Sequence, residues 1–288
     1  MTAASSGLWP ALPYAEWRET LALLQLEAQV LGKLRVACSP REPEWAHITL
    51  YVSARGLTTG PVPVPTADGR VLVEAEADLR AHEVVVRSSL GDAARVAMAA
   101  PTVAVFHAGF LDALASLGAT VELAGTPQEV ADPVPFADDD RPREYDGAAA
   151  TRFHTVLASL VPVFDEFRGA FAGRASRTQF FWGSMDLNVT RFTGEPGSAD
   201  QYAAGFWPGS DSFPEPAFYA YAAPKPDGIE VAGIEPAAAA WDSGLGEFVL
   251  RYDDVRAADD PAAAVREFLD STYAAAAAKA GWDGRLLA

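Results

Sequence analysis

The stretch from Phe180 to Gly194, which reads FFWGSMDLNVTRFTG, limits the possible folds of this chain more than any other. Polar and apolar side chains alternate along residues 182–190, and a period of two is typical of a half-buried β-strand. Such short hydrogen-bonding side chains suit the wall of a polar pocket, and they suit a solvated sheet edge equally well. The predicted apolar face carries Met185, Leu187 and Val189, and the predicted polar face carries Ser184, Asp186, Asn188 and Thr190.

Periodic patterns elsewhere predict helices and short strands. Apolar residues recur at three- and four-residue steps over 14–35 and 148–172, so both stretches are predicted helices, the second kinked or divided by Pro162. Two further helices are predicted over 103–117 and 262–280, the last following the pair Asp260-Pro261. Strands are predicted over 47–55, 70–76, 82–87, 120–123, 218–222 and 247–252, with irregular chain over 56–65 and 194–216.

The second half of the chain repeats features of the first. We therefore expect an α+β fold of two similar helix–strands–helix repeats with antiparallel sheets, fused about a pseudo-two-fold axis. The repeats are 12–124 and 148–282, joined by the linker 125–147 within a single structural unit over 1–288. Laying Trp182 on Trp45 aligns five identical pairs, which are Gly32/Gly169, Ser39/Ser176, Trp45/Trp182, Leu50/Leu187 and Val52/Val189.

Charge and cysteine content argue against several classes of function. The formal net charge is −17 and no cluster of Lys and Arg relieves it, so binding to nucleic acid or to an anionic membrane would oppose electrostatic repulsion. Cys38 is the only cysteine, which excludes an intrachain disulfide and a cysteine-based zinc cluster. The first residues lack a signal-peptide pattern and no apolar run reaches about 18 residues, so we expect a cytoplasmic protein.

No strong catalytic motif is present, which argues against nucleotide hydrolysis and dinucleotide-dependent redox chemistry. The best candidate catalytic group is His47, Ser184 and Asp186, because a histidine beside a carboxylate acts as a general base and a hydroxyl can be a nucleophile. The same residues suit structural hydrogen bonding, which is the commoner role of such side chains. The acidic run 138–140 is interpreted as a solvated loop, and no metal site or cofactor is predicted.

Arginine, threonine and aromatic residues complete the predicted ligand site. Arginine and hydroxyl groups bind carboxylates or phosphates, and aromatic rings supply rigid walls with a polar edge. Aromatic residues beside Gly and Pro suit a binding site, although they also suit the core. The candidates are Arg55, Thr58, Thr59, Trp182, Arg191, Trp207, Tyr219 and Tyr221.

Four segments resemble the characteristic segments of a bacterial family. They are HITLYVSARGLTT at 47–59, FFWGSMDLNVTRF at 180–192, AGFWPG at 204–209 and FYAY at 218–221. In this order they resemble the family of unknown function DUF5996 over nearly the whole chain, and the resemblance implies no assigned activity. Gln179 and Asp200-Gln-Tyr202 depart from the family pattern, which has a histidine and a His-Glu pair there. A metal site at those positions would retain only His47 in this chain.

These observations lead to two expectations about function. The first is a small polar or aromatic molecule bound in a pocket between the two repeats, with conversion of that molecule left open. The polar faces of 47–53 and 184–190 would line this pocket. The alternative is a non-catalytic protein–protein interaction module that docks through an exposed aromatic loop at 205–209. The sequence indicates neither a protein partner nor self-association.

Overall fold

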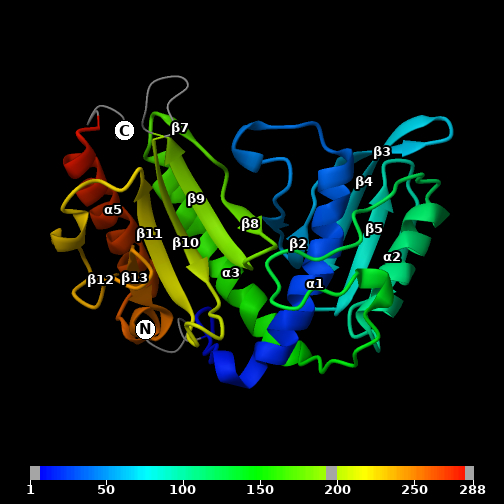
Figure 1. Cartoon of the computed structure of the whole chain (residues 1–288), viewed down its shortest axis with the longest axis horizontal. Helices are drawn as coiled ribbons and strands as arrows, with labels where there is room; N and C mark the ends of the chain where they lie inside the picture. The colour runs from blue at the N-terminus through cyan, green and yellow to red at the C-terminus, as the bar shows by residue number, and fades with distance from the viewer. Residues whose placement is uncertain (1–6, 193–199, 283–288) are drawn as a thin grey trace. The chain divides into compact units, whose positions relative to one another are not determined.

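The computed structural model describes residues 7–192 and 200–282 (Figure 1). These residues form five α-helices and two antiparallel β-sheets, so the expected α+β class is confirmed. The sequence expectations for residues 1–6 and 193–199 lie outside the described residues. Contacts divide the chain into two compact units, of which unit 1 is Met1–Glu16, Thr155–Gln179 and Asp186–Ala288, and unit 2 is Trp17–His154 and Phe180–Met185. None of the described helices combines the length and the apolar character that a membrane crossing needs.

Unit 2 contains most of the long helix α1 (Tyr14–Cys38), the helix α2 (Val103–Ser116) and one sheet. Both helices confirm predictions, and Thr102 caps α2 because its side chain accepts a hydrogen bond from the Val105 N–H. The strand order is β1-β2-β4-β5-β6, and β3 also pairs with β4. The strands are β1 (Tyr51–Val52), β2 (Gly56–Thr58), β3 (Val62–Thr66), β4 (Gly69–Asp78), β5 (Glu83–Ser88) and β6 (Ala93–Ala97).

The strand β3 replaces part of a predicted loop, because its two prolines occupy positions that need no donor. Val62 and Val64 are buried, and Pro63 and Pro65 alternate with them. Since β3 pairs with β4 along one edge, the prolines turn their missing N–H groups away from that ladder. The carbonyl of Pro65 points the same way, because it accepts a hydrogen bond from the Thr120 N–H at 2.9 Å.

Unit 1 contains the second half of α3 (Gly147–Gly169), the helices α4 (Tyr252–Ala257) and α5 (Pro261–Ala280), and the second sheet. α3 runs on through Pro162, so of the two predicted alternatives, a kink or a division, the division is wrong. Asp260 caps α5 by accepting a hydrogen bond from the Ala263 N–H at 3.0 Å, as its sequence predicts. The strand order is β12-β13-β11-β10-β9-β7. The strands are β7 (Arg174–Ala175), β9 (Asp186–Phe192), β10 (Gln201–Trp207), β11 (Ala217–Ala223), β12 (Ala240–Asp242) and β13 (Glu247–Arg251).

One face of the unit 1 sheet forms the core with α5, which runs alongside β11 in Figure 1. The ring of Tyr202 on β10 belongs to this face, and its hydroxyl lies 2.7 Å from Thr272 Oγ1 and 3.2 Å from the Leu269 carbonyl of α5. Leu187 and Phe218 are fully buried on the same face. Because side chains alternate along a strand, the even-numbered residues of β9 face the other way.

The segment 180–192 consists of two strands and a turn, so the prediction of one strand over 182–190 is wrong. β8 (Gln179–Phe181) ends before the turn Trp182–Met185, and β9 begins at Asp186. Met185 has a φ of 62°, in the left-handed region that strands do not use. Polar and apolar residues continue to alternate through the turn Trp182–Met185, so periodicity alone did not locate the turn.

Two other predicted strands and two predicted irregular stretches need correction. Within 47–55 only Tyr51–Val52 is a strand, although Leu50 forms an isolated bridge with Phe180. Residues 120–123 form no strand, and the bridge in that region is at Ala119. Residues 56–58 and 201–207, predicted as irregular, are β2 and β10.

The acidic run 138–140 is more than a solvated loop. Asp139 is buried, and its carboxylate accepts hydrogen bonds from Arg141 Nε at 2.9 Å and Arg143 Nη2 at 2.7 Å. Its carbonyl also accepts the Ala104 N–H at the start of α2, at 3.1 Å. The middle aspartate therefore fastens the segment before α3 to unit 2.

Candidate functional site

The polar face of β9 is the part of unit 1 where predicted site residues come together. Asp186, Asn188 and Thr190 follow one another on this face, and Asp186 is only 7% exposed. Asn188 lies opposite Gly205 of β10, and Gly205 lies opposite Tyr219 of β11. The polar side chains of β9 and the phenol of β11 are thus separated by one strand that has no side chain at the crossing point.

Tyr219 spans that gap and organises the polar side chains. Its hydroxyl donates a hydrogen bond to Asp186 Oδ2 and accepts one from Asn188 Nδ2 at 3.0 Å. Asn188 Oδ1 in turn accepts a hydrogen bond from Thr190 Oγ1 at 3.0 Å. The result is a continuous chain of hydrogen bonds from β11 to the middle of β9.

Gly205 is required for this arrangement. A Cβ atom at this position would overlap the Cζ and hydroxyl oxygen of Tyr219 and would lie 2.5 Å from the Leu187 carbonyl oxygen. Only a bare backbone lets the phenol cross β10. The sequence analysis missed this contact, because residues 201–207 were expected to be irregular and the pairing of Gly205 with Tyr219 is long-range.

Glu247 and Tyr221 extend the polar face toward β13. Burial, followed by the negative charge of Asp186, raises the pKa of the Glu247 carboxyl. Burial, followed by the charges of Glu247 and Asp186, also raises the pKa of Tyr221. The rings of Tyr219 and Tyr221 are stacked, with centroids 6.3 Å apart and planes at 16°. We call Asp186, Asn188, Thr190, Tyr219, Tyr221 and Glu247 the carboxylate–tyrosine cluster.

The chemistry of the carboxylate–tyrosine cluster is that of hydrogen-bond acceptors beside aromatic rings. Asp186 is held in place by Tyr219, whereas Glu247 has no ion pair within the described part of the chain. Burial and the neighbouring Asp186 charge both disfavour the ionised form of Glu247, and its pKa is raised for these two reasons. Sequence reasoning missed Glu247, because a single acidic residue at the start of a strand carries no distinguishing pattern.

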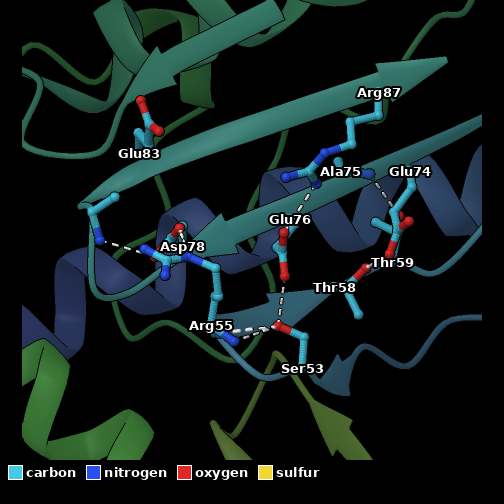
Figure 2. A network of polar contacts seen from close by, with 12 residues as sticks. Ser53, Arg55, Thr58, Thr59, Glu74, Ala75, Glu76, Asp78, Glu83 and Arg87 are labelled. Carbon is cyan, nitrogen blue, oxygen red and sulfur yellow. Dashed lines mark hydrogen bonds and ion pairs between the residues drawn. The ribbon is translucent and has the colours of Figure 1, made fainter. Parts of the chain in front are cut away.

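Three predicted ligand residues of unit 2, Arg55, Thr58 and Thr59, belong to a separate network, shown in Figure 2. Arg55 pairs with Asp78, whose Oδ1 also accepts the backbone N–H groups of Arg80 at 3.0 Å and Ala81 at 2.9 Å. Burial alone would raise the pKa of Asp78, but the hydrogen bonds from Arg55, Ala81 and Arg80 outweigh it and lower this pKa. The Asp78 carboxylate thus caps the turn between β4 and β5, and Arg55 ties that turn to the start of β2.

Thr58 and Thr59 bind neighbouring strands in the same network (Figure 2). Thr58 Oγ1 donates to the Glu74 carboxylate at 2.6 Å. Thr59 Oγ1 accepts the Ala75 N–H at 3.0 Å and donates to the Gly60 carbonyl at 2.7 Å. These hydroxyl groups join the end of β2 to β4, which is a sufficient structural role for both.

The predicted catalytic residues fall in different units. His47 and Ser184 belong to unit 2 and Asp186 to unit 1. His47 is buried, its Nδ1 accepts the Glu42 N–H at 3.3 Å, and its ring is stacked on Trp45 with centroids 5.8 Å apart. Ser184 is exposed in the turn before β9.

Trp182 is a core residue of unit 2. Its Nε1 donates to the Ile48 carbonyl at 2.7 Å, and the ring is buried. A Cβ atom at Gly32 of α1 would lie 2.5 Å from Cδ1 of this ring, so the glycine makes room for the indole. The interpretation of Trp182 as a core residue therefore has direct support.

Arg191 and Trp207 occupy different faces of the unit 1 sheet. Arg191 is 1% exposed on the core face, where its Cζ lies 3.4 Å from the Phe167 ring centroid and 4.5 Å from that of Tyr273. Burial lowers its pKa to about 10. Positions 186 and 191 differ in parity along β9, so Arg191 is directed away from Asp186. Trp207 ends β10, half-buried against Phe213 at 5.2 Å between centroids.

No group of three or more histidine, cysteine, aspartate or glutamate side chains suited to a metal ion occurs within residues 7–192 and 200–282.

Comparison with known proteins gives a family and no characterised relative. The model of a family described as a family of unknown function (DUF5996) matches residues 9–288. No curated protein and no solved structure matches the chain.

Proposed function

Since the chain belongs to the DUF5996 family, whose function is unknown, we propose from its own geometry that unit 1 binds a small polar or aromatic molecule at the carboxylate–tyrosine cluster. The observation that carries this proposal is the buried Asp186 carboxylate held by the Tyr219 hydroxyl. A buried carboxylate that is fixed in position and flanked by aromatic rings is a means of recognising a ligand.

The cluster favours ligands that bring hydrogen-bond donors and positive charge. Asp186 and Glu247 are acceptors when ionised, and their mutual repulsion is relieved by a cationic group. The stacked rings of Tyr219 and Tyr221 offer π-faces that attract an organic cation. An aromatic or aliphatic amine therefore fits better than a carboxylate or a phosphate.

Conversion of the bound molecule would use the difference between the two carboxyl groups. Asp186, with a hydrogen bond from Tyr219, would accept a proton from the ligand as a general base. Glu247 retains its proton to a higher pH and would return one as a general acid. This division of roles follows from burial and charge.

The test is ligand-observed NMR with benzylamine, benzyl alcohol and benzoate, which share a ring and differ in their polar group. We expect benzylamine to bind the wild-type chain best and Asp186→Asn to weaken that binding at least about tenfold. The matched control is Asp253→Asn, which removes a surface carboxylate of unit 1 that is 76% exposed. Binding that is equal in Asp186→Asn and wild type, or absent for all three probes, contradicts the proposal.

Burial at residues 205–209 bears on the alternative of a protein–protein interaction module. Phe206, Pro208 and Gly209 are buried, and Trp207 is half-buried. An anchor for a partner protein projects from the surface, so these positions support the small-molecule site more than the docking loop.

We also propose that the two repeats predicted from the sequence, 12–124 and 148–282, descend from a duplication. The order of a long helix, antiparallel strands and a closing helix occurs twice along the chain, from α1 to α2 and from α3 to α5. This repetition supports the shared ancestry that the aligned identities suggest.

A further inference from the structure

Lys33 is a buried lysine with an aromatic neighbour. It lies on α1 in unit 2 and is only 5% exposed. Its Nζ is 5.4 Å from the centroid of the Trp182 ring. That ring is fixed by the Nε1 bond to the Ile48 carbonyl and by its close packing on Gly32. The amine thus lies over the face of a fixed aromatic ring, which attracts a cation less strongly than a carboxylate does.

No carboxylate compensates the charge of Lys33 within the described residues. Lys225, by contrast, pairs with Glu230 at 3.4 Å. Burial is the sole cause that lowers the pKa of Lys33, and no charged side chain adds to it or opposes it. A lysine that is buried without a counter-ion holds its proton weakly, and this is the usual origin of nucleophilic lysines.

The amine nevertheless remains within reach of solvent. Among the described residues, Trp17 Nε1 and both Glu27 carboxyl oxygens are fully enclosed and have no hydrogen-bond partner. Lys33 Nζ is not one of these enclosed atoms. The enclosed part of Lys33 is therefore its carbon stem. The nitrogen is thus the part of this side chain that keeps contact with solvent.

We propose that Lys33 is a reactive amine site that forms an imine with small aldehydes. The nitrogen lone pair of the neutral amine attacks the carbonyl carbon, and the carbonyl π electrons move to oxygen to give a carbinolamine. Loss of one water molecule, made from the carbonyl oxygen and the two amine hydrogens, leaves the C=N bond. The neutral imine avoids the cost of a buried ammonium, and the Trp182 ring packs against the substituent on the carbonyl carbon.

The chain contains three lysines, so the proposal can be tested by site-resolved labelling of the wild-type protein. The full chain is treated with propanal and sodium cyanoborohydride at neutral pH, and alkylation of each lysine is followed over time by peptide mass spectrometry. Lys225 and Lys279 are both exposed and serve as internal controls. We expect Lys33 to react at least about threefold faster than either control.

Two further measurements separate reactivity from accidental labelling. In a denaturant-unfolded sample the three lysines should react at similar rates, because the advantage of Lys33 depends on the fold. Lys33→Arg should remove the fastest alkylation and leave the other two rates unchanged. A Lys33 rate in the folded wild-type chain that is equal to or below that of Lys225 and Lys279 overturns the proposal.

Discussion

Replacing Gly205 with alanine should damage the carboxylate–tyrosine cluster directly. The new methyl group would overlap the Tyr219 phenol and lie 2.5 Å from the Leu187 carbonyl oxygen, a separation that Cβ atoms essentially never show. The phenol can swing away only by giving up its bonds to Asp186 and Asn188. The Leu187 oxygen belongs to the backbone of β9 and cannot move without distorting that strand.

The expected destabilisation follows from these two effects. Overpacking a buried site costs about 1–3 kcal/mol. Loss of a hydrogen bond to a charged group, here Asp186, costs about 1.5–3 kcal/mol. Alanine also restricts the unfolded chain, which offsets about 0.4–1 kcal/mol. We therefore expect Gly205→Ala to lower the free energy of unfolding by about 2–5 kcal/mol.

Urea unfolding at neutral pH measures this change, with Gly233→Ala as the matched control. Gly233 is exposed in unit 1, and a Cβ there meets nothing within 4 Å, so its replacement should change stability by less than about 0.5 kcal/mol. Repeating Gly205→Ala in a Tyr219→Ala background should show a coupling of at least about 1 kcal/mol. A cost below about 1 kcal/mol for Gly205→Ala, or additivity of the two changes, would refute the reasoning.

Three further outcomes are expected from unit 2. Glu27→Leu should raise the free energy of unfolding at neutral pH by about 1–3 kcal/mol, because both carboxyl oxygens of Glu27 are buried with no partner among the described residues. Burial raises the pKa of Glu27, so the wild-type chain should lose stability as pH rises from the unfolded-state pKa to the folded-state pKa. Urea unfolding at several pH values should show this loss in the wild type and not in Glu27→Leu. Hydrogen bonds from Arg141 and then Arg143 lower the pKa of Asp139 despite its burial. The stability that Asp139 confers should therefore be present above its unfolded-state pKa and be lost as pH falls from that value through the folded-state pKa. Asp139→Asn should reduce the acid sensitivity of thermal unfolding. Trp182→Phe should cost about 1–3 kcal/mol in urea unfolding, since the Ile48 carbonyl loses its donor, and an unchanged midpoint would contradict this role.

Local patterns were sufficient to predict the four long helices and the best-defined strands, whereas the six-residue helix α4 was missed. An apolar stripe defines α2 and α5, and alternation defines β11. The turn at Trp182–Met185 was missed, since its residues continue the alternation of β9. β3 was missed because proline usually breaks a strand, whereas here every proline lies at an outward position.

The candidate site was predicted in part. Asp186, Tyr219 and Tyr221 were proposed from side-chain chemistry, and the structure joins them through strand register. Glu247 enters the site because β13 pairs with β11, a long-range relation that no local pattern encodes. Arg191 was included for its charge, but the parity of β9 directs it into the aromatic core.

The prolines of β3 bear on how this protein behaves at high concentration. A strand with a free edge is a template for pairing with another chain, and the pairing depends on N–H donors from both sides. The outward positions of β3 are Pro63 and Pro65, which have no N–H, and the Pro65 carbonyl is already bonded to Thr120. A strand from a second molecule would find no donor there, so this edge resists edge-to-edge aggregation.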